Sequence, residues 1–262
     1  MRPAAIVCAL LLCGGCGEPP RAIRLEWPAM GTVAAVQVRG FRSQADAAEI
    51  RDTVRRVFAG VEKLLDAHDP DSELSRLARL DDAGVVASCA PLVRPCYEAA
   101  FAFERETQGR FSPRWRGKGT LDLGAIAKGF AADLAAEAAA KSAAAARCEG
   151  ILVDLGGNLK AAKGEWKIAI YGSSPRKTAT LAENAAAATS AAYYRGGHIA
   201  DAKSGKTVER EERSVTVLLP PGGRSAMDAD ALSTVCFILG ARESATFLSA
   251  TRPDAQAIWV EK

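Results

Sequence analysis

The chain has 262 residues, of which 48% are hydrophobic and 25% charged, with a formal net charge of +3. This is ordinary globular composition, and the length suits one large or two small domains. Acidic and basic residues are interspersed without a basic stripe, which argues against nucleic acid as a partner. With only two histidines in the chain, a zinc site is also disfavoured.

The first 15 residues predict a targeting segment rather than part of the fold. A short basic start precedes an apolar run, residues 4–12, that is too short to span a bilayer. Small residues then lead to Cys16, a pattern similar to a bacterial lipoprotein signal in which this cysteine is acylated. A plain cleaved signal peptide is the alternative.

Under either reading the mature protein works outside the cytoplasm, and the lipoprotein reading predicts a periplasmic protein held at the membrane by Cys16. Residues 16–26 contain two adjacent prolines and are predicted to be a tether, which leaves residues 27–262 as a single domain. In an oxidising compartment, Cys89 and Cys96 are candidates for a disulfide because they are near in sequence.

Strands and helices are both expected in the first half of the chain. A β-type run comes first, and apolar residues at helical spacing then predict a long helix that begins at Ser43. His68 follows in a turn, where a solvated surface position is its simplest interpretation. The expected elements are a strand within 27–40 and helices at 43–67, 72–77 and 91–108.

Residues 110–120 read as a basic loop that contains Phe111 and Trp115. Such aromatic side chains either lie against a planar ring of a ligand or pack against the protein itself. The sequence leaves both alternatives open.

The stretch 121–140 predicts a short strand, a glycine turn and an alanine-rich helix, with Lys128 between Gly124 and Gly129. The first N–H groups of a helix lack intrahelical partners, and the helix dipole adds positive potential there. With a lysine beside it, this turn is a candidate anion site. An ordinary strand-to-helix connection with a solvated lysine is the alternative.

The second half of the chain mixes strands and helices without a repeat, which favours an α+β architecture. We expect a hairpin whose turn lies near Lys163 and Gly164, with the paired glycines 156 and 157 marking a bulge in its first strand. Cys236 falls in an apolar helix and is predicted to be core. The expected elements are the hairpin at 150–172, strands at 214–220 and 255–261, and helices at 225–240 and 243–250.

Three oxygen-bearing side chains share one face of the 225–240 helix. Asp230, Ser233 and Thr234 are spaced at i, i+3 and i+4. Hard oxygen ligands of this kind suit Mg²⁺, which usually keeps some positions for water or a substrate phosphate. One carboxylate makes a weak site alone, and a structural acid near a helix start is the alternative.

Seven short motifs, in order, resemble the ApbE family, the FAD:protein FMN transferases, over residues 27–262. They are AMGT (29–32), DPDSELS (69–75), LDLGAIAKGF (121–130), LVDLGGN (152–158), ATS (188–190), HIAD (198–201) and DADALST (228–234). The resemblance implies a T-fold-like α+β architecture of mixed sheets packed with helices. It also implies Mg²⁺-dependent transfer of FMN from FAD to a threonine of an acceptor flavoprotein subunit, through a phosphoester bond and with release of AMP.

Matching the motifs residue by residue assigns roles within this chain. The resemblance makes His198 the expected general base, with Asp201 as its competitor. The expected magnesium ligands are Asp230, Ser233, Thr234 and the backbone carbonyl of Ala125. The expected FAD-contacting residues are Met30, His68, Arg110, Phe111, Ser112, Asp122, Lys128 and Ile199.

The chain departs from the family pattern mainly at the flavin end. His68 stands where tyrosine is frequent, Ala78 where asparagine is usual, and Ala191 where glycine follows the serine. Residues 113–121 form a shorter segment than usual. Two alternatives to transfer therefore stay open: an FAD-binding or FAD-hydrolysing lipoprotein, and a non-catalytic assembly protein.

Overall fold

The protein is described by a computed structural model in which residues 22–170, 172, 177–191, 199–209 and 212–261 are placed. The proposed targeting segment, the acylation site Cys16 and the expected base His198 lie outside these residues. Within the described part of the chain, no helix combines the length and the apolar character needed to cross a membrane.

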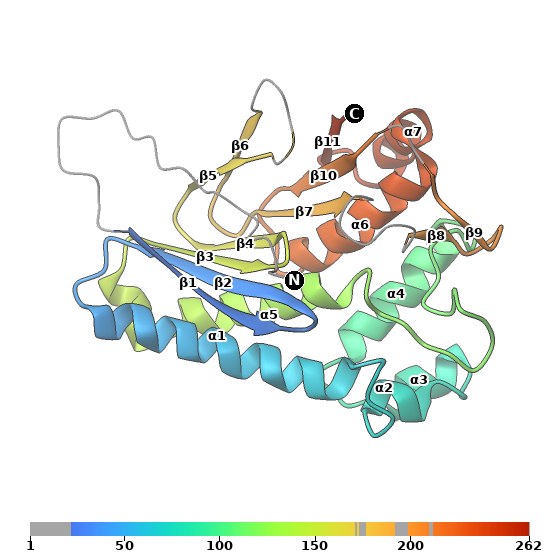
Figure 1. Cartoon of the computed structure of the whole chain (residues 1–262), viewed down its shortest axis with the longest axis horizontal. Helices are drawn as coiled ribbons and strands as arrows, with labels where there is room; N and C mark the ends of the chain where they lie inside the picture. Colours follow the sequence, from blue (N-terminus) through green and yellow to red (C-terminus); the bar gives the residue numbers. More distant parts are fainter. Residues whose placement is uncertain (1–21, 171, 173–176, 192–198, 210–211, 262) are drawn as a thin grey trace, which may run out of the picture.

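A seven-stranded antiparallel sheet forms the centre of the molecule, in the order β1-β2-β3-β4-β7-β10-β11 (Figure 1). Two small two-stranded sheets, β5-β6 and β8-β9, stand outside it. The main strands are β1 (Ala22–Ala29), β2 (Thr32–Arg39), β3 (Gly150–Leu155), β4 (Asn158–Lys163), β7 (Ala186–Ala191), β10 (Ser214–Leu219) and β11 (Gln256–Val260). The small sheets comprise β5 (Trp166–Ala169), β6 (Thr178–Leu181), β8 (Ala200–Asp201) and β9 (Lys206–Thr207).

Helices cover one face of the main sheet. Helix α5 packs on β3 and β4, α6 packs on β7 and β10, and α1 packs on α5 (Figure 1). The helices are α1 (Gln44–Leu65), α2 (Glu73–Leu77), α3 (Asp82–Ser88), α4 (Arg94–Glu106), α5 (Ala127–Ala140), α6 (Ser225–Leu239) and α7 (Ala241–Thr251), with the 3-10 helix η1 (Ala143–Arg147). The predicted α+β class is confirmed.

Helix α1 begins where the sequence predicts. Ser43 and Asp46 form a reciprocal capping box at its start, which satisfies backbone donors that the helix itself leaves unpaired. Its apolar stripe, which includes Ile50, Val54 and Phe58, is fully buried. The predicted helices over α4, α6 and α7 and the strands β10 and β11 are also present, with shifts of a few residues at their ends.

The folded domain begins before residue 27. Residues 22–26, predicted to belong to the tether, lie in β1 and pair with β2 from Ala22 opposite Arg39 onward. The apolar residues Ile23, Leu25 and Trp27 pack on the core and alternate with polar ones, which is a strand pattern that the tether assignment overlooked.

The predicted hairpin turn near Lys163 and Gly164 is wrong. Strands β3 and β4 instead meet at Gly156 and Gly157, which have φ values of +62° and +91°. Positive φ at both central residues is what a tight two-residue hairpin needs, so these glycines form the turn rather than a bulge. Lys163 ends β4, and the next strand pairs with β6 in a separate sheet.

Residues 121–123 do not form the predicted strand. The Asp122 N–H donates to the carbonyl of Pro113, and no neighbouring strand lies alongside this segment among the described residues. Leu121 and Leu123 are buried in the core, which explains the apolar pattern without a strand.

The suggested disulfide is also absent. Cys89 and Cys96 are both buried free thiols, one after the end of α3 and the other within α4. Cys236 is core, as predicted.

Candidate functional site

The starts of α5 and α6 meet at Gly129. A Cβ on this residue would lie 2.1 Å from the carbonyl oxygen of Ala226, so only glycine permits so close an approach. Its N–H donates to Oδ2 of Asp230 at 2.9 Å. The Lys128 ammonium lies 3.7 Å from the same oxygen. The lysine-bearing turn and the late acidic residue therefore lie side by side, although 101 residues separate Gly129 from Asp230.

Asp230 is a buried charged group with few compensating partners. Asp230 is only 4% exposed, and this burial raises the pKa of its carboxyl. Lys128 and the backbone N–H of Gly129 oppose that rise by favouring the ionised form. Lys128 is itself half-buried and also donates to the carbonyl of Gly124. The partly exposed Lys128 ammonium at the start of α5 is therefore the group that suits an anionic ligand here.

A second carboxylate holds the same two helices together. Asp133 of α5 accepts hydrogen bonds from the N–H groups of Ala226 at 3.1 Å and Met227 at 2.8 Å, in the first turn of α6. Lys160 of β4 lies 3.1 Å from this carboxylate. Burial raises the pKa of Asp133, and Lys160 opposes the rise.

Three hydroxyl groups gather on the face of α6 that carries Asp230. Ser190 of β7 lies 2.9 Å from the Ser233 hydroxyl and 3.2 Å from the Thr234 hydroxyl. Ser233 also donates to the backbone carbonyl of Asp230. The hydroxyls of Ser233 and Thr234 therefore meet at Ser190, while the Asp230 carboxylate on the same helix bonds to Gly129. Ser190 was missed as a site residue, although its ATS motif was one of the seven that carry the resemblance.

The Asp122 carboxylate, in the turn before α5, contacts the side chains of Trp115 and Arg116. This carboxylate accepts from the Gly124 N–H at 2.8 Å and from Trp115 Nε1 at 3.1 Å, and it lies 3.2 Å from the Arg116 guanidinium. The guanidinium stands 4.8 Å from the centroid of the Trp115 ring, which is 38% exposed. Ala125 follows at the helix start and is half-buried. Asp122 therefore orients an exposed aromatic group beside the anion site.

Met30 and His68 lie in two separate turns. Met30 has a φ of +47° in the β1-β2 turn, and its N–H donates to Glu62 at 2.8 Å. His68 is exposed, and its N–H donates to Asp66 at 2.8 Å. Within the described residues, no hydrogen bond joins either residue to the α5-α6 contact.

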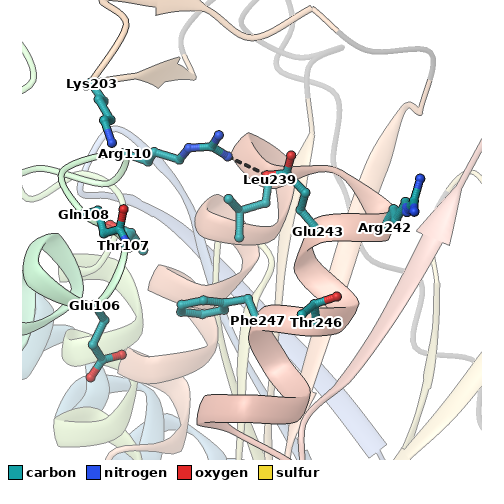
Figure 2. Close-up of a pocket in the computed structure, with 10 residues that line it drawn as sticks. All are labelled: Glu106, Thr107, Gln108, Arg110, Lys203, Leu239, Arg242, Glu243, Thr246 and Phe247. Carbon is teal, nitrogen blue, oxygen red and sulfur yellow. Dashed lines mark hydrogen bonds and ion pairs between the residues drawn. The ribbon is translucent and has the colours of Figure 1, made fainter.

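Arg110 lies on the wall of an open cleft of about 610 Å³ between the end of α4 and the start of α7 (Figure 2). It donates to Glu243 at 2.7 Å across the cleft, and its Nε lies 3.8 Å from Asp201. The Asp201 carboxylate also accepts from the N–H groups of the β8-β9 turn. This cleft does not include Lys128 or Asp230 in its lining.

The neighbours of Arg110 are less available to a ligand. The Phe111 ring is buried against Phe103, with centroids 5.8 Å apart, so it packs against the protein itself. The Ser112 hydroxyl donates to Glu104. Ile199 is buried next to the start of β8.

A metal ion in this site would not be held by a cluster of acids. Among the described residues, no group of three or more His, Cys, Asp or Glu side chains is placed to bind one. The available donors are one carboxylate, the hydroxyls on α6 and backbone carbonyls, so water or a ligand phosphate would complete the coordination.

The antiparallel sheet is covered on one face by helices, and a lysine and a carboxylate meet at two abutting helix starts, so this is an α+β protein with a candidate anion site. Residues 114–259 match the model of the ApbE family, and the chain belongs to this family. The resemblance noted in the sequence is thus confirmed.

Curated relatives carry matching names. The chain is 32% identical over 153 residues to the FAD:protein FMN transferase of Treponema pallidum (strain Nichols), covering 49% of this chain and 40% of the relative. It is 31% identical over 154 residues to the enzyme of the same name from Klebsiella pneumoniae (strain 342), covering 54% and 46%. The chain therefore matches less than half the length of these relatives.

Solved structures agree in fold over almost the whole chain. Flavin transferase ApbE from Vibrio cholerae superposes with a TM-score of 0.70 at 20% identity, covering 92% of this chain and 98% of that one. The apo form of the flavinyl transferase ApbE of Pseudomonas stutzeri gives 0.70 at 19% identity, covering 93% and 92%. At this identity the likeness establishes the fold.

Proposed function

We propose that the protein is a flavin transferase that moves FMN from FAD to a threonine of an acceptor protein and releases AMP. The observation that carries the proposal is the meeting of Lys128 and Asp230, 3.7 Å apart, at two abutting helix starts. A diphosphate bound there would face the Lys128 ammonium and the positive end of the α5 helix dipole. The names of the curated relatives, which include both FAD and FMN transfer, support this choice of diphosphate.

The residues present fit Mg²⁺ as the cofactor of this reaction. Asp230, Ser233 and Thr234 and the carbonyl of Ala125 would hold the ion, because Mg²⁺ takes oxygen ligands and shares its coordination with substrate phosphates. When bound there, it would neutralise charge on the diphosphate. Lys128 adds a second positive charge on the same side.

The transfer itself needs a hydroxyl nucleophile and a proton acceptor. The acceptor threonine would attack the FMN-side phosphorus, the bond from that phosphorus to the bridging oxygen would break, and AMP would leave with that oxygen. We assign the hydroxyl proton to His198, because histidine is the side chain that most often acts as a general base. Asp201 is the second candidate, but its carboxylate also accepts N–H groups of its own turn and faces Arg110.

Acceptor labelling tests the proposal directly. The purified protein is incubated with FAD, Mg²⁺ and a threonine-bearing acceptor domain, and the acceptor is precipitated with acid. Covalent flavin on the acceptor together with AMP, both abolished by EDTA, is the expected result. Free FMN and AMP without labelling would instead make the protein an FAD hydrolase, and bound but uncleaved FAD would leave a flavin-binding protein.

We also propose that the protein is a periplasmic lipoprotein anchored at Cys16. The support is the sequence of residues 1–16 alone. Mass spectrometry of the mature N-terminus after expression in a bacterium checks this, and an unmodified N-terminus beyond residue 16 would contradict it.

A further inference from the structure

We propose that Asp133 is a positioning residue that sets Asp230 against Lys128 by capping α6 from the neighbouring helix. The proposal deepens the function above, and it rests on that function where FAD binding is the readout. Neither α5 nor α6 has a side-chain cap of its own, because the residues preceding them, Ile126 and Arg224, make no capping hydrogen bond. Each helix instead receives a carboxylate from the other.

The two caps are arranged reciprocally. The helices touch where Gly129 meets Ala226, and each aspartate lies four residues further along its own helix. Asp230 of α6 accepts from the first turn of α5, at Gly129 N–H. Asp133 of α5 accepts from the first turn of α6, at the N–H groups of Ala226 and Met227. The position of α6 that lets Asp230 reach Gly129 is therefore the same position that Asp133 fixes.

Lys160 anchors this arrangement to the sheet. Its ammonium is buried and, besides Asp133, contacts the carbonyl of Asn184 at 2.8 Å and the Ser225 hydroxyl at 2.6 Å, as well as the carbonyl of Gly222. These groups belong to the turn before β7 and to the start of α6. A buried ammonium with this many partners holds the α6 start in one place relative to β4 and α5.

The charge on Asp133 is needed for this role. In the variant Asp133→Asn, an amide group would replace one of the oxygens that now accept N–H groups, and Lys160 would be left without its counter-ion. The α6 start would lose a charge-assisted cap. Among the described residues, Asp133 makes no hydrogen bond or ion pair with the proposed metal ligands or with Lys128, so it acts on the site through the position of the two helix starts.

Amide hydrogen exchange measured without FAD or metal tests the inference. We expect Asp133→Asn to speed exchange in the segment 124–130 by about tenfold, because Asp230 no longer holds the Gly129 N–H. We also expect Mg²⁺-dependent FAD affinity to fall by about tenfold, within the range seen when residues that orient a metal site are changed. FAD affinity measured without Mg²⁺ should change less.

Leu181→Ala is the matched control. Leu181 of β6 is buried in an apolar cluster with Trp166 and Ile168 of β5, and no residue of α5 belongs to this cluster, so the cavity opens away from α5. At an equal loss of thermal stability it should leave exchange in 124–130 and Mg²⁺-dependent FAD affinity unchanged. If Leu181→Ala produces the same two effects, or if Asp133→Asn leaves the exchange unchanged, the positioning role is overturned.

A double variant tests the proposal if Asp133→Asn does not fold. Asp133→Leu with Lys160→Met removes both buried charges together, which buried ion pairs often tolerate when the volume is kept. The double variant should fold and still show fast exchange in 124–130, and normal exchange there would refute the proposal. If the unaltered protein shows no Mg²⁺-dependent FAD binding, the proposed function fails, while the exchange result still decides the positioning role.

Discussion

At the scale of single residues, Asp230 does two tasks with one carboxylate. One oxygen accepts from Gly129 and lies near Lys128, and we propose that the group also contributes to the metal site. Truncation to alanine would remove both the cap and the ligand. The informative change is therefore to asparagine, which keeps one oxygen and the side-chain volume while removing the charge.

We predict that Asp230→Asn lowers the Mg²⁺-dependent rate of FAD cleavage by about a hundredfold or more, at the upper end of the effects expected for a residue of a metal site. AMP release at saturating FAD measures this rate. Asp228→Asn is the control, because Asp228 is in the same helix but pairs with Arg224 at the surface. If both variants lose the same cleavage rate, the loss comes from a general disturbance of α6 and not from the metal site.

Asp154 makes the stability of the fold depend on pH. It is buried in β3, bonded to Arg24 at 3.0 Å and to the Gly157 N–H at 3.0 Å, and burial raises the pKa of its carboxyl above the ordinary 3.8. At a pH between the pKa of Asp154 in the unfolded chain and its raised pKa in the folded protein, folding takes up a proton. The contribution of this group to stability is therefore present at low pH and is lost as the pH rises through that window.

We predict that the wild-type protein gains stability relative to Asp154→Asn when the pH is lowered from about 7 to about 4.5. Guanidinium unfolding of both proteins at each pH measures the difference, and titrations elsewhere in the chain cancel because both proteins share them. A difference that stays constant or moves the other way would show that the pKa of Asp154 is not raised.

At the scale of elements, the close approach of α5 and α6 depends on small side chains. Gly129 faces Ala226, and α5 buries several alanines against its neighbours. The sequence predicted both helices from their apolar pattern. It could not predict that they cap each other, because Asp133 lies 94 residues from Met227. Taken alone, Asp133 and Asp230 each look like an ordinary helix acid.

We predict that Gly129→Ala destabilises the protein by about 1–3 kcal/mol, the usual cost of inserting a methyl group into a packed core. It should also weaken Mg²⁺-dependent FAD binding, because the helices must separate. Gly60→Ala in α1 is the control, since nothing lies within 4 Å of a Cβ there and alanine favours a helix. Chemical denaturation of both variants should therefore give changes of opposite sign.

At the scale of the whole molecule, the site joins segments from β7, α5 and α6 under one sheet, and the cleft beside Arg110 lies apart from it. The architecture followed from the ordered motifs, since composition and periodicity indicated only an α+β class. The β3-β4 turn was not predicted at Gly156 and Gly157 because paired glycines occur in bulges as well as in turns. Only the strand pairing of the folded protein distinguishes the two.

The four described cysteines should behave as buried thiols throughout the folded molecule. Burial raises the pKa of Cys236 to about 12 and also raises that of Cys96, so the reactive thiolate is scarce at neutral pH. We predict that iodoacetamide leaves Cys89, Cys96, Cys148 and Cys236 unmodified in the native protein and labels all four after unfolding without reductant. Peptide mapping by mass spectrometry checks this, and a Cys89–Cys96 bridge would appear as two unlabelled residues.

The exchange of caps between α5 and α6 has a consequence for engineering by recombination. In a chimaera that takes residues 127–140 from one homologue and 225–239 from another, the two capping acids and the close contact at Gly129 would come from different parents. Crossover points should therefore keep both segments with the same parent, together with Lys160 and Ser190 from the chain between them.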